Sequence, residues 1–131
     1  MGDFKKLQVW QRAHELALRV EIIASAIRRS KPSFANQLER AADSVPANIA
    51  EGRGRGTDAD FAHFVSIAIG SVTEVENHLQ RGYDARLISP ADYSELTATA
   101  IHIRRMLIGL RRTLRGQPRE VAAVRPKDDL N

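Results

Sequence analysis

Residues 37–52, QLERAADSVPANIAEG, decide the fold of this chain. Polar side chains recur through the stretch at steps of three and four residues, so they share one face of a helix. We call this set the polar seam: Gln37, Arg40, Ser44, Asn48 and Glu51. The adjoining face is small and apolar: Ala41, Ala42, Val45 and Ile49. The pattern predicts a helix that packs tightly against neighbours which also need hydrogen bonds.

Pro46 lies in the middle of this stretch. A proline inside a helix removes one backbone hydrogen bond and clashes with the preceding turn, at a cost of about 3 kcal/mol. The helix therefore either breaks near Ser44 or continues with a kink at Pro46. We favour the kinked, continuous helix because the face pattern runs through the proline without a change of phase. Ser44 and Ala47 are small enough to leave room for it.

The sequence on either side predicts three more amphipathic helices, because apolar residues recur there with a helical period. The four expected helices cover residues 5–29, 33–53, 57–86 and 89–115, to within a few positions. Glycines end the second helix, and Ser33, Thr57 and Ser89 are expected to cap the second, third and fourth. Trp10, in the first turns of the first helix, is expected to anchor the core or an interface.

Four amphipathic helices with short loops predict an all-α, up-down-up-down four-helix bundle over residues 1–116. A chain of 131 residues is long enough for one domain with one core. Residues 117–131 contain two prolines and are predicted to form a disordered or loosely packed tail. The chain has no cysteine and no apolar run near the roughly 18 residues of a membrane span. We therefore expect a cytoplasmic protein that makes no membrane contact.

Arginine provides most of the 20 basic residues, and the formal net charge is +4. Between residues 101 and 116 five arginines occur without an acid: Arg104, Arg105, Arg111, Arg112 and Arg115. Arg53 and Arg55 add a basic, glycine-rich loop. Two interpretations stay open. The cations either stabilise a helix C-terminus and keep the bundle soluble, or they bind phosphates without reading sequence. Exposed aromatic residues for base stacking are not evident.

Neither a metal centre nor a catalytic site is predicted. Di-metal bundles use two acid-x-x-His pairs, whereas Asp60 and His63 form one here, and His14 and His102 have no such partner. Glu74 and His78 are expected to pair within one helix. Glu51 and Glu74 could meet across helices two and three and shift each other's pKa values, which leaves an enzyme as a third hypothesis. No nucleophile or oxyanion donor accompanies them, so we expect no enzyme, no metal and no cofactor.

The chain resembles a known family over about residues 4–114. The resemblance rests on SVPANIAEG at 44–52, on VWQ at 9–11, and on IAIGS at 67–71 followed by Glu74. These residues are similar to those of the bacterial four-helix-bundle proteins called 23S rRNA intervening-sequence proteins. The loop between helices one and two is shorter than is usual in that family, and the tail after Gly116 is extra.

The resemblance implies a homo-oligomeric ring, typically a pentamer. The family is also similar to the accessory protein of diversity-generating retroelements, a pentamer that binds a reverse transcriptase and nucleic acid through a basic surface. Each subunit of a ring presents two different faces to its neighbours. The polar seam, with Pro46, Gly70, Ser71 and Glu74, is expected at the subunit boundary, where Gly70 and Ser71 would let the third helix approach closely.

The sequence therefore favours a non-enzymatic, homo-oligomeric scaffold or adaptor. It would contact RNA or a ribonucleoprotein through Arg53, Arg55 and the arginines of the fourth helix. The alternative is a protein-interaction module with no nucleic-acid role. The resemblance supplies no defined activity.

Overall fold

The computed structural model describes residues 3–117, and every regular element in that range is helical. A 3-10 turn, η1 (Phe4–Lys6), is followed by α1 (Gln8–Ile27), α2 (Pro32–Arg53), α3 (Asp58–Asp84) and α4 (Pro90–Leu114). The expected all-α class with four helices is confirmed for this range. The predicted tail lies outside the described residues, apart from Gln117.

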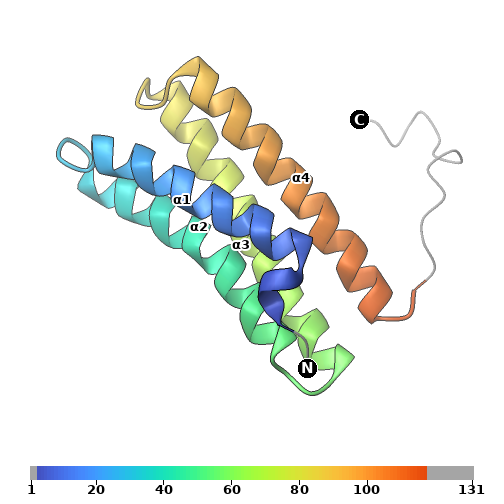
Figure 1. Ribbon diagram of the computed structural model, residues 1–131. Helices are drawn as coiled ribbons and strands as arrows, with labels where there is room; N and C mark the ends of the chain where they lie inside the picture. The colour runs from blue at the N-terminus through green and yellow to red at the C-terminus, as the bar shows by residue number, and fades with distance from the viewer. Residues whose placement is uncertain (1–2, 118–131) are drawn as a thin grey trace, which may run out of the picture.

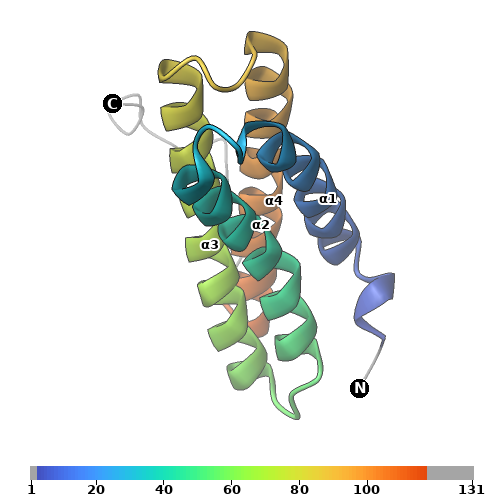
Figure 2. The ribbon, with the colours of Figure 1, turned by 90° about the vertical axis from the view of Figure 1, so that its left-hand side faces the viewer.

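The four helices pack lengthwise, and the chain turns back at each loop (Figures 1 and 2). The contact between α2 and α3 is the most extensive, and that between α1 and α4 is the least. Because α1 neighbours α2 and α4, α1 and α3 lie diagonally across the bundle. The start of α1, the α2–α3 loop and the end of α4 lie together at one end, which we call the α2–α3 end (Figure 1).

The core is the set of apolar stripes that the sequence pattern places on each helix. In α1 the buried stripe is Val9, Ala13, Leu16, Ala17, Val20 and Ala24. The largest fully buried side chains from the other helices are Leu38, Ile49, Leu79, Leu96, Ile103 and Leu107. Each such side chain stabilises the fold by about 1.5–3 kcal/mol relative to an exposed one.

The helix boundaries differ from the sequence expectation at two places. The second helix begins at Pro32 with Lys31 as its N-cap, so the expected cap at Ser33 is wrong. A proline in the first helical position loses no hydrogen bond, which lets the helix begin earlier. The first helix does not begin near residue 5, because Leu7 is extended and separates η1 from α1.

Two other helix starts follow the expectation. Thr57 Oγ1 accepts a hydrogen bond from the Asp60 amide at 3.1 Å, and Ser89 Oγ accepts one from the Asp92 amide at 3.1 Å. The helix also continues through Pro46, whose side chain is buried. The predicted continuity of α2 is therefore confirmed, and the alternative of a break near Ser44 is excluded.

Candidate functional site

The inner part of the polar seam joins α2 to α3 within one chain. Ser44 Oγ and Ser71 Oγ lie 2.8 Å apart. Asn48 Nδ2 donates to the Ser44 carbonyl at 2.8 Å and to Ser44 Oγ at 2.9 Å. All three residues are half-buried. The Ser44–Ser71 hydrogen bond links α2 to α3, and Asn48 holds Ser44 from within α2, so part of the seam serves the bundle itself.

The outer part of the seam faces an open hollow of about 380 Å³ between α2 and α3. Gln37, Arg40 and Glu74 line it above Ser44 and Ser71. Glu74 also lies 3.3 Å from His78 Nε2, so the expected intrahelical pair is present. Gln37 donates to Ser33 Oγ at 3.3 Å within its own helix. The hollow therefore presents polar groups of both charge signs to the outside.

The structure does not bring Glu51 and Glu74 together. Ser44 meets Ser71, whereas Gly52 approaches Phe61, so α2 and α3 run in opposite directions. Glu51 is seven residues beyond Ser44 and Glu74 is three beyond Ser71, which separates them by roughly 15 Å along the bundle at 1.5 Å per residue. Glu51 pairs instead with Arg55 at 2.9 Å. The structure therefore excludes the pairing of Glu51 with Glu74 that the sequence had left open.

The role of the glycines also differs from the sequence expectation. A Cβ at Gly52 would lie 2.8 Å from Phe61 Cδ1 and from Phe64 Cβ, and one at Gly82 would lie 2.5 Å from Ile88 Cδ1. These two glycines allow close packing, a role that the sequence analysis did not assign to either of them. Gly70 is exposed, and a Cβ there would meet nothing within 4 Å. Gly70 therefore brings α3 close to no other part of the described chain.

The arginines of α4 form two rows. Arg104 pairs with Glu76 of α3 at 2.8 Å, whereas Arg111 and Arg115 donate to the neutral hydroxyl of Ser66 at 3.2 and 3.5 Å. Arg105 and Arg112 are seven residues apart and form the second row, which lies about 100° round the helix from Arg104 and Arg111. Arg105 is exposed, and Arg112 is half-buried. Within residues 3–117, no carboxylate lies within hydrogen-bonding distance of Arg111 or Arg115.

Arg53 and Arg55 lie where α2 ends. Arg55 pairs with Glu51, and its guanidinium also lies 4.8 Å from the centre of the Phe64 ring. Arg53 is half-buried, and its Nε is shielded from solvent without a hydrogen-bond acceptor. Since α3 begins at the same end, these two residues lie at the α2–α3 end with Arg111 and Arg115 (Figure 1). Five of the seven predicted arginines therefore cluster there: Arg53, Arg55, Arg111, Arg112 and Arg115.

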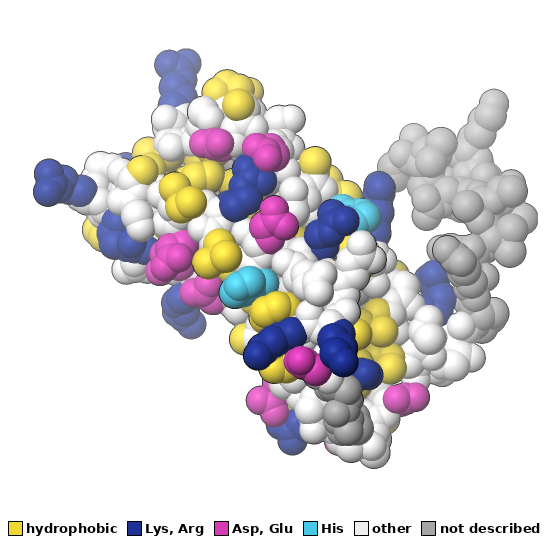
Figure 3. Space-filling model, in the orientation of Figure 1, with side chains coloured by type: hydrophobic (Ala, Val, Ile, Leu, Met, Phe, Trp, Pro, Cys, Tyr) yellow, Lys and Arg dark blue, Asp and Glu magenta, His cyan; other side chains and the backbone are white. Residues whose placement is uncertain are grey.

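Figure 3 shows the face with α1 in front, where basic and acidic side chains alternate with hydrophobic ones. On α1, Leu18 is 49% exposed and Ile22 is 72% exposed. Nearby, burial raises the pKa of Asp43, and the charges of Glu39 and Glu21 raise it further. The surroundings of Asp43 are therefore acidic, whereas the face as a whole carries both charge signs and exposed apolar residues.

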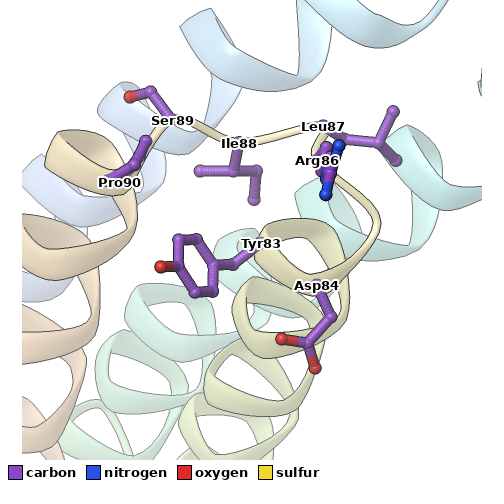
Figure 4. A pocket seen from close by; sticks show the side chains of 7 residues that line it. All are labelled: Tyr83, Asp84, Arg86, Leu87, Ile88, Ser89 and Pro90. Atoms are coloured by element: carbon purple, nitrogen blue, oxygen red, sulfur yellow. The ribbon is translucent and has the colours of Figure 1, made fainter.

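A hollow of about 650 Å³ lies beside the α3–α4 loop (Figure 4). Tyr83 extends beneath the loop, and the side chain of Ile88 points from the loop toward Tyr83. Asp84 is directed away from both. The hollow is lined by residues 83, 84 and 86–90. Because its polar groups do not converge, it offers no evident catalytic arrangement.

Within residues 3–117, no group of three His, Asp or Glu side chains is placed to hold a metal ion. The Asp60–His63 pair has no second copy, and the ring of His63 packs edge-on against Phe64 at 5.4 Å. No helix in the described range is long and apolar enough to cross a membrane.

The sequence model of the 23S rRNA-intervening sequence protein family matches residues 5–109. The chain belongs to this family. The match covers the seam, the α2–α3 loop and most of α4, so these features lie within the family domain, whereas Arg111, Arg112 and Arg115 lie just beyond it.

One solved structure supports the fold of this intervening-sequence protein. It is the crystal structure of a protein of unknown function from the S23 ribosomal protein family of Bacteroides thetaiotaomicron. The two are 23% identical, the alignment covers 79% of this chain and 97% of that chain, and the TM-score is 0.75. No curated protein matches the sequence.

Proposed function

We propose that this intervening-sequence protein is a non-enzymatic, homo-oligomeric scaffold or adaptor that contacts RNA or a ribonucleoprotein. Its subunits are up-down-up-down bundles arranged in a ring, taken as a pentamer from the family resemblance. The protein works in the cytoplasm. The arginines at the α2–α3 end bind phosphate groups, and the family's name associates its members with ribosomal RNA genes.

The observation that carries the RNA proposal is the hydrogen bonding of Arg111 and Arg115. Both guanidiniums donate to Ser66 Oγ, which orients them without neutralising their charge. No acid occurs between residues 101 and 116. Oriented arginines of this kind suit bidentate contact with phosphate oxygens, which gives affinity without sequence preference.

The apolar residues left exposed on two diagonal helices support the oligomer. Leu18 and Ile22 lie on the outer side of α1, while Ile67, 40% exposed, and Gly70 lie on the outer side of α3. Because α1 and α3 are diagonal, these two patches point in opposite directions. A repeating contact between two different patches closes into a ring when its rotation permits.

The same exposed patches favour the second candidate, a protein-interaction module that contacts no nucleic acid. Leu18 and Ile22 would then bind another protein rather than a second copy. The two candidates differ in what the arginines do, since only the first requires them for binding.

The test reverses charge at two sites in the full chain. Arg111→Glu/Arg115→Glu alters the proposed surface, and Arg29→Glu/Arg81→Glu makes the same charge change at the opposite end of the bundle. Light scattering gives the mass of each oligomer, and anisotropy of a labelled structured RNA gives its affinity.

We expect micromolar or tighter binding by the wild type, at least tenfold weaker binding by the first variant, and a much smaller effect of the second. Equal losses in both variants would show that only net charge matters. An absence of binding by the wild type at low salt would overturn the RNA proposal in favour of the protein-interaction module.

A further inference from the structure

Three rings form a continuous stack where α1 begins. Phe4 meets Trp10 edge-on, with ring centres 5.1 Å apart and planes at 68°. Trp10 lies nearly parallel to His14, at 4.7 Å and 11°. Trp10 is half-buried and packs against the core, whereas His14 is exposed. Trp10 therefore ties the three rings to the core, and the ring of His14 lies on their exposed side.

The outer face of His14 has no partner within the described residues. No hydrogen bond, ion pair or second ring contact engages this side chain. Two other histidines differ: His78 is buried and lies 3.3 Å from Glu74, and His63 packs against Phe64. His14 is thus a flat ring, supported from behind, with one face open to solvent.

Basic residues stand beside the stack on a segment that is held in place. Asp3 Oδ1 accepts from the Lys5 amide at 2.9 Å, and Gln11 Nε2 donates to the Lys5 carbonyl at 2.8 Å. Both Lys5 and Lys6 are exposed, and the first turn of α1 contains no acid. Since η1 packs against α1 and α2, the lysines are presented from a fixed turn rather than from a free end.

We propose that His14, supported by Trp10, stacks an unpaired base of a single-stranded nucleic acid whose backbone is bound by Lys5 and Lys6. Aromatic rings with nearby cations bind single strands in this way, because every base has a face that can stack. The inference rests on the proposed function and specifies its ligand as unpaired rather than duplex. It also revises the sequence expectation that no aromatic residue is available for stacking.

The stack supplies its own reporter, because Trp10 is the one tryptophan in the sequence. The full chain is titrated at pH 8 with oligouridine, with oligothymidine and with a duplex RNA of equal length. Tryptophan emission reports the stack, and anisotropy of the labelled strand independently reports binding. Comparison of oligouridine with oligothymidine distinguishes RNA from DNA as the source of the base.

We expect saturable quenching of the Trp10 emission by the single strands and little change with the duplex. His14→Ala should weaken single-strand binding about tenfold, and His14→Tyr should restore most of it, because loss of one stacked base costs on the order of 5- to 100-fold in affinity. His102→Ala is the matched control, since His102 is also exposed and, among the described residues, no ring packs against it. Its affinity should equal that of the wild type.

Two outcomes would overturn the inference and leave the proposed function standing. In one, single strands bind by anisotropy but the Trp10 emission does not change. In the other, His14→Ala binds as tightly as His102→Ala. If neither the single strands nor the duplex RNA bind at low salt, both the inference and the RNA proposal fail. If quenching occurs but the Arg111→Glu/Arg115→Glu variant binds normally, the stack is correct and the arginine surface is wrong.

Discussion

Substituting Gly52 by alanine should destabilise the bundle. The added Cβ would lie 2.8 Å from Phe61 Cδ1 and from Phe64 Cβ. Phe64 Cβ is bonded directly to the α3 backbone, so a shift of its side chain cannot remove the clash, and the two helices must separate. Overpacking of this kind costs about 1–3 kcal/mol, and the better helix propensity of alanine returns up to about 1 kcal/mol. We expect a net loss of about 1–2 kcal/mol in the free energy of unfolding.

Gly70→Ala is the matched control in the neighbouring helix. Its Cβ would meet nothing within 4 Å, so alanine should stabilise the subunit by about 0.5–1 kcal/mol. Urea unfolding at several protein concentrations separates subunit stability from assembly. If Gly52→Ala is as stable as Gly70→Ala, the proposed close packing of α2 on α3 is wrong. A smaller oligomer mass for Gly70→Ala alone would place this glycine in the subunit contact.

Two further substitutions test the seam and the acidic face. Asn48→Leu removes both hydrogen bonds to Ser44 and should cost about 1–3 kcal/mol by urea unfolding or disrupt the oligomer. Arg29→Ala, at an exposed position, should change either by little, and equal effects of the two substitutions would contradict this. The pKa of Asp43 is raised by burial and by Glu39 and Glu21, so its contribution to stability is present at low pH and is lost as pH rises through the folded-state pKa. Asp43→Asn should therefore raise the urea midpoint at about pH 7 but not at about pH 3, and an equal gain at both would refute the assignment.

The helices could be predicted because their signals are local. The period of apolar residues marks the buried stripes, and Thr57 and Ser89 act as caps through hydrogen bonds that span three residues. The continuity of α2 through Pro46 could also be predicted, because the phase of the pattern is unchanged across it. Ser33 was misassigned since two start signals compete within three residues and the proline at position 32 prevails.

The site was less predictable because it depends on pairing between helices. The sequence shows that Glu51 and Glu74 are acidic but not that the Ser44–Ser71 register separates them. Similarly, the sequence does not show that Gly52 is closely packed and that Gly70 is open, because the difference depends on the neighbouring helix. The stack of His14 on Trp10 did have a sequence signal, a four-residue spacing of two aromatic rings on one helix.

The most direct test of the proposed function is the salt dependence of RNA affinity for an oligomer of measured mass. The dissociation constant for a labelled structured RNA is measured at several salt concentrations for the wild type and for Arg111→Glu/Arg115→Glu. We predict a steep dependence for the wild type and a logarithmic slope shallower by about 1.4–1.8 for the variant, since each of the two lost phosphate contacts contributes about 0.7–0.9. Identical slopes for the two proteins, or no binding by the wild type at low salt, would contradict the proposal that these arginines contact RNA.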